Sequence, residues 1–209
     1  MPGNPASPSS SPGGSESYFP GPGDAWETVA PGDVRWNKGR LDDALAFVEQ
    51  TNASAFIMLH RGRIMAEGYW KGAGLHFSGD IASAQKSMIS IMAGVAVNAG
   101  KLSLDAPASQ YLGKGWTKTR ADEEERVNVR HLLSMSSGLT SELAFADEPG
   151  TVWYYNNPAY HTMKVVLERA VGKDLTGYSR ETLWRPLGMG DSSWEPRPHM
   201  LMPDGVTPM

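Results

Sequence analysis

The spacing of apolar residues predicts a helix and a hairpin in the first part of the chain. Between residues 41 and 48, four apolar side chains recur on one face of a helix, and turn-forming residues follow at 51–52. Residues 55–60 and 63–70 are two strand-like runs separated by an Arg-Gly pair. We therefore expect an amphipathic helix followed by a β-hairpin.

The most apolar segment of the chain comes next. Residues 83–99 are apolar on nearly every side and are closed by Gly100, so they predict a helix that is central and buried. Further helices are expected at residues 129–135, at 158–170, and just before Pro186. Strands first and helices later predict an α+β fold. Its sheet is short of strands, because a lone hairpin is at best marginal in water.

The first residues have a different composition from the rest. Residues 1–24 are dominated by Pro, Ser and Gly, which predicts a disordered leader, and residues 25–209 are expected to form the folded part. At 209 residues with 40% hydrophobic content, the chain can build a sizeable core.

Charge and composition exclude several classes of function. The formal charge is −4 and no basic run is long enough to follow a phosphate backbone, so nucleic acid is not an expected partner. We expect no membrane span and see no secretory signal pattern, and the compartment stays open. There is no Cys, and the five His residues are scattered. No metal or cofactor is expected, and the acidic run at residues 123–125 is interpreted as a solvated loop.

Ser83 and Lys86 are the first candidates for chemistry. They lie three apart at the start of the apolar helix, so both side chains project from its first turn. A serine hydroxyl needs a nearby base, and the N-terminus of a helix offers free N–H groups to an oxyanion. The alternative is a capping Ser and a solvated Lys, because about one Ser-x-x-Lys is expected by chance in a chain this long.

A second candidate lies in the segment PGTVWYYNNPAY, residues 149–160. Tyr155 and Asn157, two apart just ahead of a helix, present a phenol and an amide that can reach into a cleft. The alternative is that the tyrosines are ordinary half-buried aromatics and that Asn157 caps the following helix. Tyr154 and Asn156 have the same spacing.

In this order, the motifs resemble the serine β-lactamase and penicillin-binding protein superfamily, in particular its class C-like branch. The resemblance covers about residues 55–195 through five segments: DIASAQKSM (80–88), GKLSLDAPASQYL (100–112), VRHLLSMSSGL (129–139), PGTVWYYNN (149–157) and LWRPLGMGDSSW (183–194). It implies a β-lactamase/transpeptidase-like fold, with an antiparallel sheet, flanking helices and a helical lobe.

The resemblance also implies roles for four residues. Ser83 would be the acylated nucleophile, Lys86 the base or proton shuttle, Tyr155 the group that assists proton transfer to the leaving group, and Asn157 the residue that orients Lys86 and the substrate. The family pattern has an aromatic residue five positions after the catalytic Tyr. Tyr160 occupies that position and selects Tyr155 over Tyr154.

One departure from the family pattern stands out. The third family motif, Lys-Thr-Gly or His-x-Gly on a strand, does not occur after Asn157, and the His-Arg-Gly at residues 60–62 is expected to be a structural turn. The chain is therefore expected to be the N-terminal part of a β-lactamase-related domain whose C-terminal strands are missing.

The expected partner is a small-molecule amide or ester. A β-lactam, a D-amino-acid peptide, a short-chain ester and an amide oligomer of the aminohexanoate type all remain open. A non-catalytic binding or scaffold protein that retains part of the fold is the alternative from another class.

Overall fold

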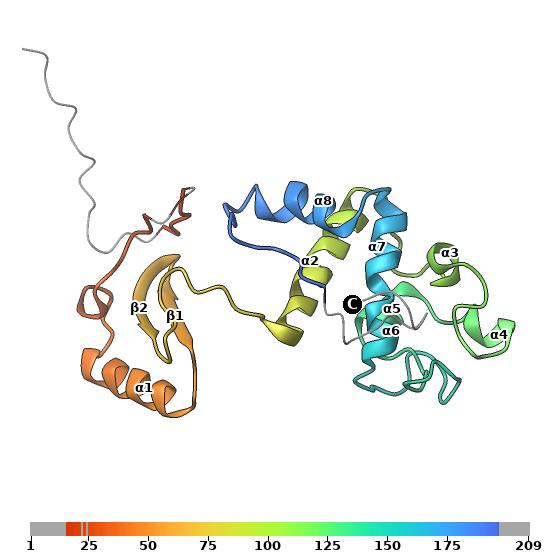
Figure 1. Ribbon diagram of the computed structural model, residues 1–209, viewed down its shortest axis with the longest axis horizontal. Coiled ribbons are helices and arrows are strands. Elements are labelled where there is room, and N and C mark those ends of the chain that lie inside the picture. The colour runs from red at the N-terminus through yellow and green to blue at the C-terminus, as the bar shows by residue number, and fades with distance from the viewer. Residues whose placement is uncertain (1–15, 22, 24, 197–209) are drawn as a thin grey trace, which may run out of the picture. The chain divides into compact units, whose positions relative to one another are not determined.

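The computed structural model describes residues 16–21, 23 and 25–196. They belong to two compact units, Met1–Gly79 and Asp80–Met209, which are described separately (Figure 1). Most of the leader expected at residues 1–24 lies outside the described residues, so that boundary stays a prediction.

The first unit contains the expected helix and hairpin. A 3-10 turn, η1 (Pro31–Val34), precedes α1 (Lys38–Gln50), and the Asn37 side chain caps α1 by accepting a hydrogen bond from the Arg40 N–H. Strand β1 (Ala55–His60) pairs antiparallel with β2 (Arg63–Tyr69), and this is a two-stranded sheet among the described residues. The hairpin and its bounds thus agree with the sequence pattern to within one residue.

The hairpin turn explains the Arg-Gly pair. Arg61 and Gly62 both have a positive φ, 49° and 87°, as a tight two-residue turn requires. At Gly62 a Cβ would lie 1.9 Å from the Tyr18 carbonyl oxygen, because Tyr18 donates its N–H to Arg61 beside the turn. The turn therefore has room only for glycine at this position.

The second unit is helical in its described part. A 3-10 turn, η2 (Ala82–Ala84), leads into α2 (Gln85–Asn98). After it come α3 (Ser109–Leu112), α4 (Ala121–Glu124), α5 (Val129–Leu133), α6 (Asn157–His161), α7 (Met163–Val171), α8 (Leu175–Ser179) and the π-helical turn η3 (Arg180–Trp184). Helix α7 contacts α2, α3, α5, α6 and α8, and its Val166 and Leu167 are completely buried. Its apolar face is thus the centre of this core.

Helix α2 is less buried than its composition predicts. Met92 and Ala96 are fully buried on the side that faces α7 and η3, but Ile91 is 48% exposed and Val95 and Val97 are also exposed. The expected helix is present, but the prediction that it is buried is correct for only one of its sides in the described structure. An apolar pattern shows which side chains avoid water, but not whether neighbouring elements suffice to cover them.

The helix expected at residues 158–170 is divided into α6 and α7. The break falls at Thr162, whose hydroxyl donates to the Ala159 carbonyl at 2.6 Å. Such a side-chain bond competes with the backbone pattern of a helix, and a short threonine side chain favours it.

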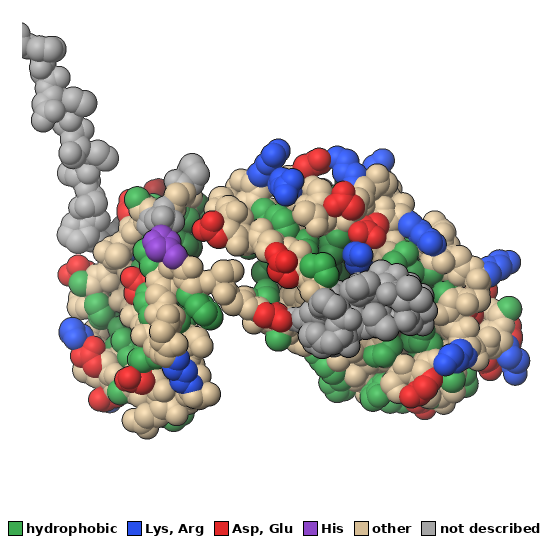
Figure 2. Space-filling view, in the orientation of Figure 1, with side chains coloured by type: hydrophobic (Ala, Val, Ile, Leu, Met, Phe, Trp, Pro, Cys, Tyr) green, Lys and Arg blue, Asp and Glu red, His purple; other side chains and the backbone are tan. Residues whose placement is uncertain are grey.

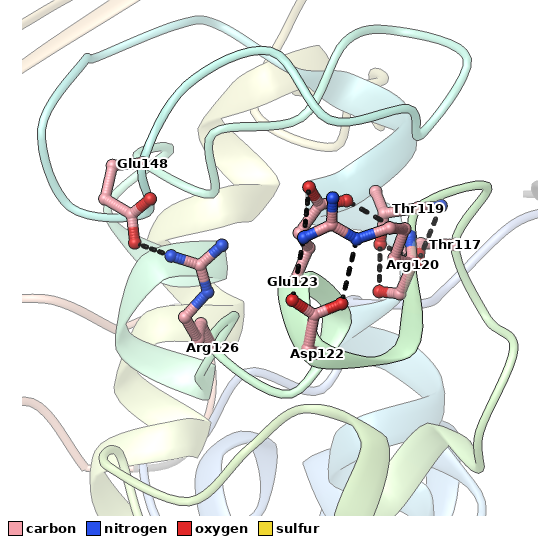
Figure 3. Close-up of polar contacts among 7 residues, drawn as sticks. All are labelled: Thr117, Thr119, Arg120, Asp122, Glu123, Arg126 and Glu148. Atoms are coloured by element: carbon pink, nitrogen blue, oxygen red, sulfur yellow. Dashed lines mark hydrogen bonds and ion pairs between the residues drawn. The ribbon is translucent and has the colours of Figure 1, made fainter.

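The acidic run is not the solvated loop that the sequence suggests. Glu124 is only 3% exposed, and its carboxylate accepts hydrogen bonds from the Gly115 N–H and from the N–H and hydroxyl of Thr117. Asp122 is exposed and pairs with Arg120, and the mostly covered Glu123 also lies beside Arg120 (Figure 3). Hydrogen bonds from Arg120 lower the pKa of Asp122 to about 2, so this pair is ionic at neutral pH, although such exposed pairs stabilise little.

None of the helices in the described ranges is both long and apolar enough to cross a bilayer. On the face drawn in Figure 2, the acidic and basic side chains of the second unit lie interspersed. The absence of a nucleic-acid partner stays a prediction.

Two glycines with the same φ allow a test of the close backbone approach in the loop after α5. Gly138 and Gly172 both have φ 71°, but a Cβ would lie 2.1 Å from the Asp147 carbonyl oxygen at Gly138 and would meet nothing within 4 Å at Gly172. Gly172→Ala should cost about 1 kcal/mol of unfolding free energy for the left-handed conformation alone. Gly138→Ala should cost about 1–3 kcal/mol more, because the loop backbone must move. Urea unfolding measures both, and equal losses would contradict the close approach.

Candidate active site

The turn that carries Ser83 is strained at the preceding residue. Ala82 has φ 47°, a conformation that costs a non-glycine residue about 1–2 kcal/mol. The Asp80 carboxylate accepts the Ala82 N–H at 2.6 Å and so stabilises the turn. Ser83 lies in this turn and Lys86 in the first turn of α2, so both side chains leave the same end of the helix.

The structure brings Ser83, Lys86 and Tyr155 into mutual hydrogen-bond contact. Lys86 Nζ lies 3.1 Å from Ser83 Oγ and 3.1 Å from Tyr155 Oη, and Tyr155 Oη lies 2.7 Å from Ser83 Oγ. Ser83 and Tyr155 are separated by 72 positions in the sequence, so this triangle exists only in the folded chain. A hydroxyl bonded to both an amine and a phenol has two groups that can take up its proton.

The loop before α6 determines which tyrosine reaches the nucleophile. The Tyr154 N–H donates to the Met135 carbonyl at 2.9 Å, and the Gly150 N–H donates to that of Ser136 at 2.7 Å. These two bonds hold residues 150–154 against the residues that directly follow α5. Both tyrosines are partly exposed, but among the described contacts only Tyr155 reaches Ser83.

The two adjacent asparagines have different environments. Asn156 is 2% exposed and caps α6 through its Oδ1, which accepts the Ala159 N–H at 3.1 Å. Its Nδ2 donates to the carbonyls of Leu139 and Thr140. The cap is therefore Asn156, not Asn157 as the alternative interpretation had it. Proline is most common at the first helical position, which favours the residue directly before it as the cap, but α6 begins one residue earlier and Pro158 is its second residue.

Asn157, the first residue of α6, makes no described contact with the triangle. Its Oδ1 is buried and has no hydrogen-bond partner among the described residues. Lys86 Nζ donates to Ser83 and Tyr155, and the structure gives no bond from it to Asn157. The role of Asn157 in orienting Lys86 and the substrate stays a prediction.

The electrostatic environment separates Tyr155 from Tyr160. The hydrogen bond with Ser83, followed by the hydrogen bond from Lys86 and its charge, lowers the pKa of the Tyr155 phenol below its ordinary value near 10. Burial, with a smaller effect of Tyr155, raises the pKa of Tyr160 to about 12. Of these two phenols, Tyr155 is therefore the one that gives up its proton more readily.

The side chains around the triangle are apolar and accessible. Trp153 is 68% exposed and its ring centroid lies 6.3 Å from that of Tyr155. Ile81, two residues before Ser83, and Val152 are also exposed. In the described ranges, no group of three or more His, Asp or Glu side chains is arranged to hold a metal ion. The arrangement places a serine hydroxyl in contact with an amine and a phenol, with exposed apolar side chains nearby.

Comparison with known families decides the membership of the chain. The family model for beta-lactamases matches residues 41–208. The chain belongs to the beta-lactamase family. The match includes Ser83, Lys86, Tyr155 and Asn157. A comparison with curated protein sequences found no match.

Solved structures show the beta-lactamase fold. A class C beta-lactamase superposes with a TM-score of 0.59 at 18% identity, over 73% of this chain and 49% of that one. EstCE1, a hydrolase with promiscuous acyltransferase activity, gives 0.57 at 20% identity, over 72% and 52%. A D-stereospecific amidohydrolase from Streptomyces sp. gives 0.53 at 18% identity, over 63% and 47%.

The expected family and fold class are thus confirmed. The chain has the mixed helical and antiparallel-sheet architecture of the β-lactamase/transpeptidase-like fold, and it spans about half the length of these solved structures.

The asparagine pair allows a comparison of stability and activity. Asn156→Ala removes the cap and leaves two carbonyls without their donor, so the unfolding free energy should fall by about 2–4 kcal/mol. Asn157→Ala removes an acceptor that has no partner and should change it by no more than about 0.5 kcal/mol. If Asn157 contacts the substrate, its variant should nevertheless slow acylation of Ser83. Chemical unfolding and labelling rates give both quantities, and the reverse order of stabilities would contradict the assigned cap.

The lowered pKa of Tyr155 can be measured directly. Tyrosinate absorbs near 295 nm, so a pH titration of the folded protein should contain one phenol that ionises below the ordinary value near 10. Tyr155→Phe should remove that component, and Ser83→Ala and Lys86→Met should each move it to higher pH because they remove stabilisation of the phenolate. An unchanged titration of the Tyr155→Phe protein would disprove the assignment.

Proposed function

We propose that this chain carries the acylation site of a serine hydrolase that acts on amide or ester bonds. The observation that carries the proposal is the hydrogen-bonded triangle of Ser83, Lys86 and Tyr155. Membership of the beta-lactamase family supports it, as do the hydrolase and the amidohydrolase among the structures of similar fold.

The first half of the reaction forms the acyl-enzyme. Ser83 Oγ attacks the substrate carbonyl carbon while the Ser83 proton passes to the hydrogen-bonded Tyr155–Lys86 pair. The oxyanion forms at the N-terminus of α2, where we assign the Ser83 N–H as a donor. Collapse of the tetrahedral intermediate breaks the bond to the amine or alcohol, which leaves with the proton that the pair returns.

The second half of the reaction hydrolyses the acyl-enzyme. Water attacks the acyl carbon, loses its proton to the same pair, and releases the carboxylic acid as Ser83 Oγ regains a proton. No metal or redox group takes part in either half. The exposed rings of Trp153 and Tyr154 beside Tyr155 favour substrates with an apolar group near the scissile bond.

The acylation step is tested with a rhodamine fluorophosphonate and with p-nitrophenyl acetate on the 209-residue chain. One adduct per chain is expected, on the peptide that contains Ser83, and Ser83→Ala should abolish it. Lys86→Met should slow it by about 10²-fold or more, the usual size of a general-base effect. Ser90 is an exposed serine on the same helix, and Ser90→Ala should react like the unmodified chain.

Two outcomes would contradict the proposal. Labelling that persists in Ser83→Ala would place the nucleophile elsewhere. If the chain shows a cooperative unfolding transition and yet neither probe labels it, the non-catalytic binding protein is the better description.

A further inference from the structure

Tyr160 contacts Lys86 in two different ways. Its hydroxyl donates a hydrogen bond to the Lys86 backbone carbonyl at 3.0 Å, and its ring centroid lies 5.5 Å from Lys86 Nζ. Tyr160 belongs to α6 and is 5% exposed, whereas Lys86 lies 74 positions earlier in α2. The Tyr160 hydroxyl therefore holds the Lys86 backbone, and the Tyr160 ring lies against the Lys86 ammonium group.

A second ring completes the surroundings of the Lys86 ammonium group. Lys86 Nζ also lies 5.1 Å from the ring centroid of Tyr155. Among the ion pairs of the described residues, none includes Lys86. The two aromatic faces thus take the place of a carboxylate partner. Such cation–π contacts contribute about 0.5–2 kcal/mol each and leave the amine hydrogens free to bond to Ser83 and Tyr155.

The restraint matters because of the length of the lysine side chain. Its four-carbon stem has about 2 kcal/mol of rotamer entropy, so an unrestrained amine spends much of its time away from the nucleophile. A carboxylate would hold the amine but would compete for its hydrogens. An aromatic ring holds the cation without accepting the hydrogen bonds that the reaction needs.

Burial keeps Tyr160 in one protonation state. Its pKa is raised to about 12, so the phenol stays neutral and continues to donate to the Lys86 carbonyl over the range in which Tyr155 ionises. Tyr160 is thus a structural donor and not a proton acceptor.

We propose that Tyr160 is a positioning residue that holds Lys86 Nζ within hydrogen-bond reach of Ser83 Oγ and Tyr155 Oη. The inference rests on the proposed function, since it assigns Tyr160 to the acylation of Ser83.

The chain provides a matched control in Tyr178. Its hydroxyl also donates to a backbone carbonyl of α2, that of Met92, at 3.1 Å, and it is 7% exposed. Met92 lies six positions beyond Lys86, and the described contacts of Lys86 do not include Tyr178. Tyr178→Phe therefore removes an equivalent bond from the same helix without touching the triangle.

The first experiment separates positioning from stability. The p-nitrophenyl acetate burst gives the acylation rate constant and the dissociation constant for Phe and Leu variants of Tyr160 and Tyr178. Each Tyr→Phe change should lower the unfolding free energy to a similar extent. Tyr160→Phe should slow acylation about 3- to 5-fold and Tyr160→Leu more than about 10-fold, because the backbone bond and then also the ring are lost. The Tyr178 variants should stay within about twofold, and the dissociation constant should not change in any of them.

The second experiment does not depend on turnover. In protein labelled with ¹³C-lysine, the Lys86 side-chain resonance is assigned by its loss in Lys86→Met. The nearby rings should shift its methylene protons upfield. The shift should persist in Tyr160→Phe and in both Tyr178 variants, and it should shrink markedly in Tyr160→Leu.

The outcomes separate the two hypotheses. The positioning role is overturned if the Tyr160 and Tyr178 variants slow acylation equally. It is also overturned if the chemical shift of the Lys86 methylene protons is the same in Tyr160→Leu as in the unmodified chain. If the folded chain is never acylated, the proposed function fails, and the resonance of Lys86 then decides by itself whether Tyr160 holds this side chain.

Discussion

The candidate site depends on holding Tyr155 within one hydrogen-bond length of Ser83 and Lys86, which lie 72 and 69 positions earlier in the sequence. Ser83 lies in η2 and Lys86 in the first turn of α2, and Tyr155 comes from the loop before α6. Hydrophobic packing of α7 against α2 supplies the force, since Val166, Met163 and Met92 are almost completely withdrawn from water. Because α6 and α7 follow directly on Tyr155, the packing that buries α7 also sets the position of the phenol.

Hydrogen bonds within the loop between α5 and α6, residues 134–156, fix the path of its backbone. Asn156 is bonded to both Leu139 and Thr140 and also begins α6, so one buried amide joins the start of the loop to its end. Gly138 allows the backbone near Asp147 to come closer than any side chain would permit. Many backbone groups of this loop thus have partners within the loop itself, although it contains no helix or strand.

The sequence predicted those features that depend on a local pattern. The hairpin, the apolar helix and the order of the motifs follow from residues close together in the chain. The Ser83–Lys86 and Tyr155–Asn157 motifs, in that order with the segments around them, indicated the family. It could not distinguish Asn156 from Asn157, because adjacent asparagines have the same capping preference until the helix start is known. It also missed the burial of Glu124, which depends on N–H groups of Gly115 and Thr117 that no composition reveals. The four-residue helices α3 and α4 are too short to show a period.

The two tyrosines that donate to carbonyls of α2 have a mechanical consequence. Lys86 and Met92 are six positions apart, which in an α-helix separates their carbonyls by about 9 Å along the axis and about 120° around it. The Tyr160 bond holds the end of the helix that carries Lys86, next to Ser83, and the Tyr178 bond holds the helix almost two turns further on. A shift of the helix at the first position would move Ser83 and Lys86 relative to the Tyr155 phenol, whereas a shift at the second would act mainly on the packing of α2 against α8. The two hydroxyls therefore hold the same helix, and only that of Tyr160 holds it at the candidate site.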